Sequence, residues 1–176
     1  MSKKNITLLT VGLLIILGLS ARLLPHPANF APITAIALFC GLYLPRRWSI
    51  IVPIVAMFVS DIFIGFYDWK IMLAVYFCFI LTGLIGSVVQ NRKSFATILG
   101  GTLSGSILFF LITNLAVWAF GTMYIHNFAG LLECYTMAIP FFRNSLLGDL
   151  FFTGILVGTM ESVLYFNCLR LAKKAV

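Results

Sequence analysis

Residues 95–120 read FATILGGTLSGSILFFLITNLAVWAF, a stretch that contains no charged side chain. The hydrocarbon core of a bilayer is about 30 Å thick, and a helix needs roughly 20 apolar residues to cross it. This stretch exceeds that minimum. A helix is also one of the few backbone forms that satisfies its own hydrogen bonds in lipid. Residues 95–120 therefore predict a transmembrane helix, and they indicate the class of the protein.

Further apolar stretches lie on both sides of this one. Short segments rich in proline and charged residues separate them, and none of these segments is long enough to form a domain. The predicted helices are approximately 6–21, 30–44, 48–66, 71–89, 95–120 and 144–169. The first two are short, so each would cross a membrane only if nearly upright or flanked by snorkelling side chains. We therefore expect residues 1–176 to form one all-α domain, an integral membrane bundle of six transmembrane helices.

The composition of the whole chain agrees with this class. Its mean hydropathy is +1.07, 61% of its residues are hydrophobic and 10% are charged. A soluble domain has about 25% charged residues. The net charge of +7 comes from lysines and arginines that occur as scattered pairs in short loops. Nucleic acid is not an expected partner, because a nucleic-acid surface gathers such residues into one patch. The expected surroundings are a lipid bilayer.

The distribution of lysine and arginine predicts the orientation of the chain. If the N-terminus is cytoplasmic, the inner side carries Lys3, Lys4, Arg46, Arg47, Arg92, Lys93, Arg170, Lys173 and Lys174, and the outer side carries Arg22, Lys70 and Arg143. This asymmetry follows the positive-inside rule. We expect a multi-pass protein of the bacterial inner membrane with both termini in the cytoplasm. As an alternative, Lys3-Lys4, the apolar run and Gly18-Leu19-Ser20 resemble a cleavable signal peptide.

The predicted topology places four charged residues, each within or beside an apolar stretch, near the outer face. They are Arg22, Asp61, Arg143 and Asp149. A charge inside a bilayer costs several kcal/mol, so it is kept where it is paired, faces the bundle interior or serves a function. Two interpretations are open for the aspartates. They form structural ion pairs with the arginines, or they bind a ligand.

Depth along the helices brings further polar residues to the same level. At the helical rise of 1.5 Å per residue, Asp61 lies about 8 Å from the outer end of the third predicted helix. We expect the site to be an outward-facing pocket. Its polar groups would orient a small-molecule substrate, and its aromatic side chains would enclose that substrate. The predicted substrate-binding residues are Asp61, Asn114, Trp118, Arg143 and Asn144, and the predicted supporting residues are Arg22, His26, Tyr135 and Asp149.

The outer stretch between the fifth and sixth predicted helices is long and apolar. Residues 124–142 are punctuated by Gly130 and Pro140 and are too short to add two further crossings. Non-helical backbone at membrane depth is tolerated only where protein or a water-filled cavity satisfies it. We expect a lid or a re-entrant segment over the mouth of the bundle. The alternative is a fixed amphipathic helix at the membrane interface.

No sequence motif supports catalysis, a metal or a cofactor. The four cysteines form no C-x-x-C pair, and neither Gly-x-Ser-x-Gly nor His-Glu-x-x-His occurs. We therefore expect no catalytic residues, no metal site and no cofactor, with an intramembrane enzyme as a remote alternative. A second alternative is a structural or assembly protein of the cell envelope, because a fold does not fix a function.

Several motifs resemble those of a family of small bacterial membrane proteins described as transport proteins. They are RLLPHPANFAP at 22–32 followed by Ala35, Ser60-Asp61, NLAVW at 114–118, and AIPFFRN at 138–144 with Gly148-Asp149. That family is similar in turn to the substrate-binding S components of energy-coupling factor (ECF) vitamin transporters. Many S components carry an Ala-x-x-x-Ala pattern for docking in the first helix, and this chain departs from it. The first predicted helix has Gly12, Gly18 and Ala21 instead, and the spacing occurs only at Ala31 and Ala35, in the second predicted helix.

The resemblance implies both a function and partners. S components are six-helix bundles that capture a scarce, vitamin-like micronutrient at the outer face of the membrane. They work with a transmembrane coupling subunit and a pair of cytoplasmic ATPases, which supply the energy. This chain has no G-x-x-x-x-G-K-[ST] motif of its own, so ATP hydrolysis would belong to those partners.

Overall fold

The structure, a computed structural model, describes the backbone of residues 3–25 and 27–174 and the side chains of residues 4–25 and 27–168. This part of the chain contains helices and no strand. The elements are α1 (Lys3–Leu23), α2 (Ile33–Tyr43), α3 (Arg46–Ile64), α4 (Trp69–Val89), the 3₁₀ turn η1 (Gln90–Arg92), α5 (Phe95–Phe120) and α6 (Phe128–Lys174). The expected all-α class is confirmed. The bounds of α5 are those that the sequence predicted.

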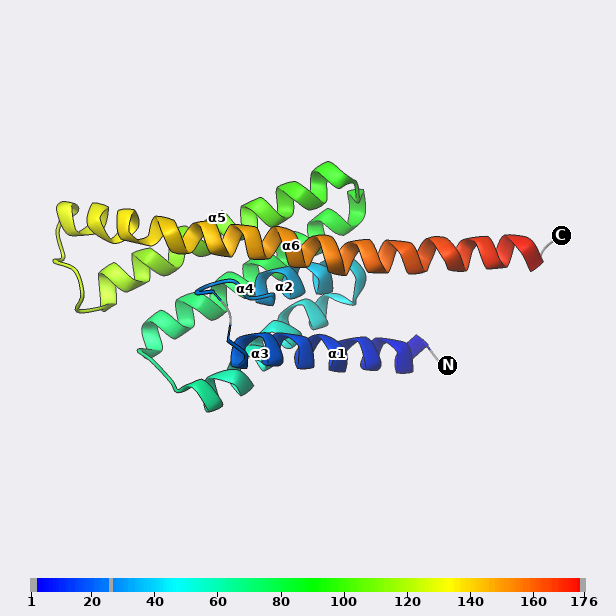
Figure 1. The fold of residues 1–176 in the computed structure, drawn as a ribbon, viewed down its shortest axis with the longest axis horizontal. Helices are drawn as coiled ribbons and strands as arrows, with labels where there is room; N and C mark the ends of the chain where they lie inside the picture. The colour runs from blue at the N-terminus through cyan, green and yellow to red at the C-terminus, as the bar shows by residue number, and fades with distance from the viewer. Residues whose placement is uncertain (1–2, 26, 175–176) are drawn as a thin grey trace.

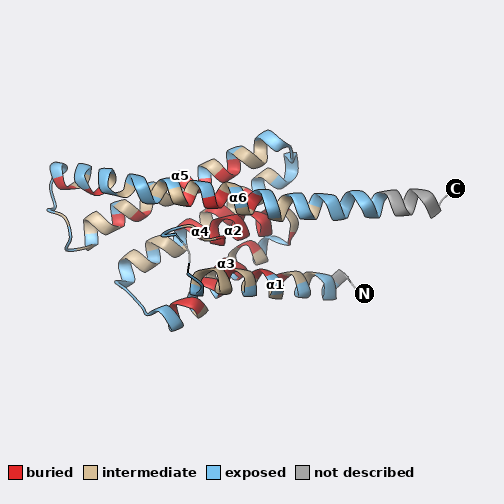
Figure 2. Cartoon of the chain, in the orientation of Figure 1, coloured by how far each residue is buried: buried red, intermediate tan, exposed pale blue. Residues whose placement is uncertain are grey.

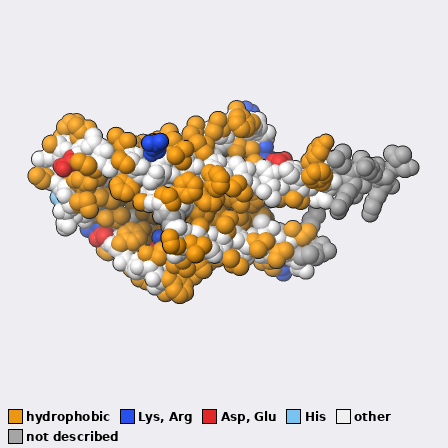
Figure 3. Space-filling model, viewed as in Figure 1, with side chains coloured by type: hydrophobic (Ala, Val, Ile, Leu, Met, Phe, Trp, Pro, Cys, Tyr) orange, Lys and Arg blue, Asp and Glu red, His pale blue; other side chains and the backbone are white. Residues whose placement is uncertain are grey.

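Among the described residues, five helices are long and apolar enough to cross a membrane, and α2 is the exception. The molecule presents a largely apolar surface with few charged side chains on the face seen in Figure 3. Large apolar side chains are exposed along its helices, for example Leu13, Phe63 and Phe77. Apolar surface of this extent needs a partner other than water. A bilayer would supply such a partner, and the length and composition of these five helices suit one.

Helix α2 is shorter than predicted and lies at the centre of the bundle. It has 11 residues, and every residue from Ile33 to Leu42 is buried. Its neighbours include α3, α4, α5 and α6, and the buried residues in Figure 2 concentrate around it. The helix stops at Tyr43 because Pro45 disfavours a helical conformation at the residue before it, and Leu44 is extended. Residues 30–32, predicted as helix, instead belong to the loop that enters α2.

The backbones of α2, α3 and α4 touch through glycines. A methyl group added at Gly41 would lie 2.3 Å from the carbonyl oxygen of Gly83. One added at Gly83 would lie 2.3 Å from the carbonyl oxygen of Ser49 in α3. Small residues of this kind allow membrane helices to approach one another closely. Because the hydrophobic effect does not drive helices together in lipid, van der Waals packing at such contacts stabilises the bundle instead. The centre of the bundle is therefore fixed by contacts between backbones.

Helix α6 corrects the predicted boundary of the sixth helix. It begins at Phe128 rather than at residue 144, and it continues through Pro140 to Lys174. Its 47 residues, at a rise of 1.5 Å each, make a rod about 70 Å long. Residues 128–142 therefore do not form the interrupted segment that Gly130 and Pro140 suggested. They are the first turns of α6, and only residues 121–127 form a loop.

The two ends of the bundle differ in what they carry. The start of α1 and the end of α6 lie at one end, here called the terminal end, as Figure 1 shows. The loops 65–68 and 121–127 lie at the other, the loop end. At the terminal end, the Tyr43 hydroxyl donates to Glu161 of α6, and Lys93 Nζ lies 3.6 Å from the same carboxylate. These contacts tie α6 to the end of α2 and to the start of α5.

Candidate functional site

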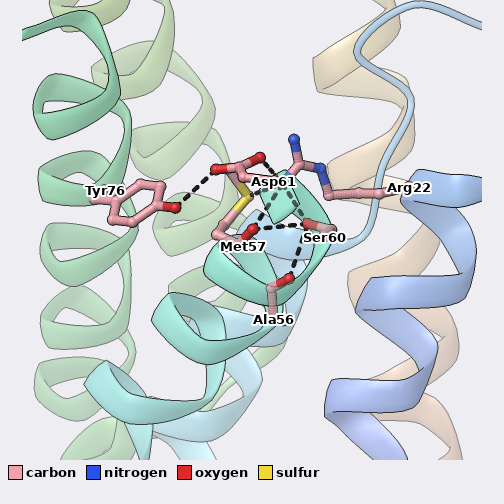
Figure 4. Close-up of polar contacts among 6 residues, drawn as sticks. All are labelled: Arg22, Ala56, Met57, Ser60, Asp61 and Tyr76. Carbon is pink, nitrogen blue, oxygen red and sulfur yellow. Dashed lines mark hydrogen bonds and ion pairs between the residues drawn. The ribbon is translucent and has the colours of Figure 1, made fainter. Parts of the chain in front are cut away.

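A buried ion pair joins α1 to α3 in the half of the bundle nearer the loop end. Arg22 Nη1 lies 2.8 Å from Asp61 Oδ1 (Figure 4), and the Asp61 side chain is 1% exposed. Arg22 is in the last turn of α1, and Asp61 is in the last turn of α3. The sequence left open whether Asp61 pairs with an arginine. The structure places it against Arg22, which lies at the same depth.

The side chains around this ion pair fix its geometry. Arg22 Nη1 donates to Ser60 Oγ at 2.6 Å and lies 2.9 Å from the sulfur of Met57. The Tyr76 hydroxyl, from α4, donates to Asp61 Oδ2 at 2.7 Å, as Figure 4 shows. Asp61 Oδ1 accepts no aligned hydrogen bond in the described structure, so its only compensation is the nearby guanidinium. A buried pair of this kind links three helices, and removing one partner leaves an uncompensated charge.

Asp149 is the second buried carboxylate, and it has no cationic partner. It lies in α6 and is 2% exposed. Ser106 of α5 donates to Asp149 Oδ2 at 2.6 Å, and the Thr34 hydroxyl at the start of α2 also bonds to the carboxylate. Among the described side chains, no Lys, Arg or His nitrogen lies within 4.0 Å of it. Of the two interpretations that the sequence left open for Asp149, pairing with an arginine is not found among the described residues.

A cavity of about 220 Å³ is lined by one residue of each carboxylate site, Arg22 of the ion pair and Asp149. Its polar lining is Arg22, Asn29, Thr34, Tyr67, Ser145 and Asp149. Its apolar lining includes Val75, Phe79 and Phe109. A concave site with mostly apolar walls and a few convergent polar groups is the usual form of a small-molecule site. We call this space the inner cavity.

A second cavity, of about 230 Å³, adjoins the first. The two share Asn29, Val75, Phe109 and Ser145 as lining residues. Asn114 and Thr113 of α5 line only the second, together with Ala138, Phe141 and Phe142 of α6. We call it the outer cavity, because its walls come from parts of α5 and α6 nearer the loop end. Phe109 is the aromatic residue that both cavities share, and each cavity also has polar lining residues of its own.

The loop from α1 to α2 reaches both cavities through one unusual residue. Asn29 has a φ of 63°, in the left-handed region that asparagine tolerates better than most residues. The next residue, Phe30, packs against Gly148, where an added methyl group would lie 3.2 Å from the Phe30 ring. The Asn144 amide donates to the Ala28 carbonyl at 3.1 Å. Residues on α6 thus hold this loop in place beside the cavities.

Tyr67 stands in the loop between α3 and α4, at the edge of the inner cavity. Burial and the nearby Asp61 carboxylate raise the pKa of Tyr67 to about 12, although Arg22 acts in the opposite direction. The phenol therefore stays protonated at neutral pH. It offers a neutral hydroxyl to a molecule in the cavity.

The structure brings together only some of the residues that the sequence predicted as a site. Asp61 and Arg22 meet, Asp149 and Arg22 line the inner cavity, and Asn114 lines the outer cavity. Arg143 and Asn144 instead line a separate groove on α6 of about 490 Å³, with Ile139, Pro140 and Leu147. Arg143 and Asn144 therefore do not line the inner or the outer cavity, and Asp61 lines neither cavity itself.

The other predicted residues have structural contacts. Trp118 Nε1 donates to the Ile125 carbonyl at 3.1 Å and so holds the 121–127 loop. The Tyr135 hydroxyl donates to the Leu111 carbonyl at 2.7 Å and joins α6 to α5. His26 lies outside the described residues. Within the described part of the chain, no three side chains of the metal-binding types gather into a metal site.

Sequence reasoning missed the hydroxyl and amide groups that line the cavities. Thr34, Ser106 and Ser145 carry no sequence signal, because hydroxyl side chains in apolar helices commonly bond to their own backbone. Asn29 had a weak signal, since asparagine follows a Pro-x-Pro turn at the end of the quoted 22–32 motif. Its place at the boundary of both cavities appears only in the fold.

These features define an all-helical protein with helices of membrane-spanning length and a polar-lined cavity. The chain belongs to DUF6580, a family of unknown function, whose model matches residues 2–169. No curated protein and no solved structure matches the chain. The family match includes the ion pair and both cavities.

Proposed function

We propose that this protein is a membrane transport protein that binds a small, vitamin-like micronutrient at the outer face for uptake. The observation that carries the proposal is the pair of adjoining, polar-lined cavities within an otherwise apolar bundle. Buried polar groups in a membrane protein are costly, and they usually mark a substrate path or a ligand site. A scaffold would need neither the space nor the converging polar side chains.

The charge distribution supports an outward-facing loop end. Arg46, Arg47, Arg92 and Lys93 lie in the turns at the terminal end, which the positive-inside rule assigns to the cytoplasm. The inner cavity is lined from the last turn of α1, the first turn of α2 and the loop before α4, all of which lie toward the loop end. A ligand would then enter from outside, in the bacterial inner membrane, with both termini in the cytoplasm.

In this proposal the substrate contacts shift from those that the sequence suggested. Asn29, Asn114, Ser145 and Asp149 offer polar groups to the ligand, and the ion pair between Arg22 and Asp61 holds the wall. The first turns of α6 serve as the lid, because Ala138, Phe141 and Phe142 cover the outer cavity. Pro140 supplies a hinge, since proline removes one backbone hydrogen bond from a helix.

The resemblance to ECF S components supplies the energetic part of the proposal. A separate coupling subunit and an ATPase pair would drive release of the ligand into the cytoplasm. The terminal end, where α6 is tied to α2 and α5, is the side on which such partners would act.

Extraction of small molecules that purify with the full-length protein tests the binding step. Ser145 lines both cavities and is 9% exposed, so Ser145→Leu would fill the space that they share. We expect mass spectrometry to find a bound molecule in the parent protein and to lose it in Ser145→Leu. The matched control is Ser162→Leu, because Ser162 is an exposed residue on the same helix. If no molecule accompanies the parent protein after growth in rich medium, the cell-envelope scaffold becomes the better explanation.

A further inference from the structure

We propose that the molecule bound in the inner cavity carries a positively charged nitrogen, for which the Asp149 carboxylate is the counter-ion. This inference rests on the proposed function and names the class of its substrate. It is carried by the cavity, the burial of Asp149 and the absence of a cation beside it in the described structure.

The balance of charge around the inner cavity is the first step. Asp149 and Arg22 line the cavity, and Asp61 pairs with Arg22 without lining the cavity itself. The guanidinium lies 2.8 Å from Asp61, so that pair is already neutral overall. Arg143, which the sequence offered as a second cation, lines a different groove. The walls of the cavity therefore have one carboxylate in excess.

The partners of Asp149 are the second step. Ser106 and Thr34 orient the carboxylate by donating hydroxyl hydrogen bonds, but a hydroxyl carries no charge. A carboxylate removed from water is costly unless a cation or a proton neutralises it. A ligand ammonium group in the cavity would supply that neutralisation, and charge-assisted hydrogen bonds to a buried carboxylate are stronger than neutral ones.

The other walls suit the same ligand. Phe79 and Phe109 stand side by side with ring centroids 5.5 Å apart and planes inclined by 32°. Both line the inner cavity, as does the phenol of Tyr67. Aromatic faces attract cations through their ring quadrupoles, most strongly where the cation is desolvated. An anion would meet these faces and the Asp149 carboxylate, while the Arg22 guanidinium is already engaged.

Three ring compounds that differ mainly in charge test the proposal on the full-length protein in lipid nanodiscs. Benzylammonium is the cation, benzyl alcohol is its neutral counterpart and benzoate is the anion. Binding is measured by the rise in melting temperature over a concentration series at constant salt. We expect benzylammonium to bind at least tenfold more tightly than either of the other two, which is about 1.4 kcal/mol of binding free energy. The same melting-temperature series with sodium chloride instead of benzylammonium tests whether an inorganic cation occupies the cavity.

Two variants assign the charge preference to one residue. Asp149→Asn should bring benzylammonium to the affinity of benzyl alcohol, while Glu161→Gln should keep the preference. Glu161 is the matched control, because it is a carboxylate on the same helix but outside the cavities. If Asp149→Asn does not fold, the comparison of the three probes on the parent protein still shows whether the cavity prefers a cation.

Several results would overturn the inference. They are equal binding of benzyl alcohol, tighter binding of benzoate, no binding of benzylammonium, and stabilisation by sodium ions that exceeds that of benzylammonium. None of these results touches the proposed function if a molecule still purifies with the protein and is lost in Ser145→Leu. If no molecule purifies with the parent protein, the proposed function itself is refuted.

Discussion

Replacement of Arg22 by methionine should destabilise the protein far more than removal of a charge elsewhere. Asp61 is 1% exposed, one of its oxygens is bonded to Tyr76, and the other has only Arg22 beside it. Arg22→Met keeps an apolar stem next to Met57 but leaves a buried carboxylate without its cation. Breaking a buried ion pair from one side costs about 3–5 kcal/mol. Reversible unfolding of the purified protein in mixed detergent micelles, followed by circular dichroism, measures this loss.

Two further variants make the measurement specific. Arg143→Met removes the same charge from the groove on α6, where no ion pair holds it in the described structure, and should change the free energy of unfolding by less than about 0.5 kcal/mol. Arg22→Met combined with Asp61→Asn removes both charges and should recover most of the loss. If Arg22→Met costs no more than Arg143→Met, the Arg22–Asp61 pair is not the constraint that the geometry indicates. If the double variant recovers nothing, the packing of Arg22 matters and its charge does not.

Three other expectations concern packing, orientation and movement. Gly83→Ala would press a methyl group onto the Ser49 carbonyl and should lower the free energy of unfolding by about 1–3 kcal/mol. The control is Gly100→Ala, which should not lower it, because a methyl group there meets nothing within 4 Å. Equal effects of the two variants would contradict the close contact between the helices. With the native cysteines replaced, Arg47→Cys and Asn91→Cys should resist an impermeant thiol reagent in intact cells and Trp69→Cys should react; the reverse pattern would refute the orientation. Amide hydrogen exchange in residues 128–142 should slow when ligand binds, and equally slow exchange with and without ligand would indicate a fixed cover.

The class of the protein and most helix bounds could be predicted from the sequence because lipid imposes a simple rule. An uncharged stretch between breakers is a helix, so residues 95–120 were assigned without error. The short second helix was predicted too long, because Phe30 and Ala31 are apolar and give no sign that Pro32 delays the start. The sixth helix was predicted too short, because Pro140 suggested a break that the helix tolerates.

The sequence predicts the depth of the candidate site residues along the helices, but not the side of each helix on which they lie. Counting residues gives the height of a side chain in a membrane, and on that basis Arg22 and Asp61 were placed at one level, where they meet. Counting residues does not show which way a helix is rotated about its axis when the predicted start of that helix is wrong. Arg143 was therefore assigned to the pocket, while its helix presents it to a separate groove. The hydroxyls that hold Asp149 come from α2 and α5, and only the packed fold brings them together.

The uninterrupted length of α6 has a mechanical consequence. One stretch of this rod covers the outer cavity, another carries Asp149, and a third is fastened to Tyr43 and Lys93 at the terminal end. Beyond the hinge at Pro140 the helix is continuous, so the part that carries Asp149 and the part that carries Glu161 tilt together. A tilt of this part that makes room in the cavities would strain the Glu161 contacts at the terminal end. Under the proposed transport function, ligand binding in the cavities would therefore be felt at the terminal end through α6.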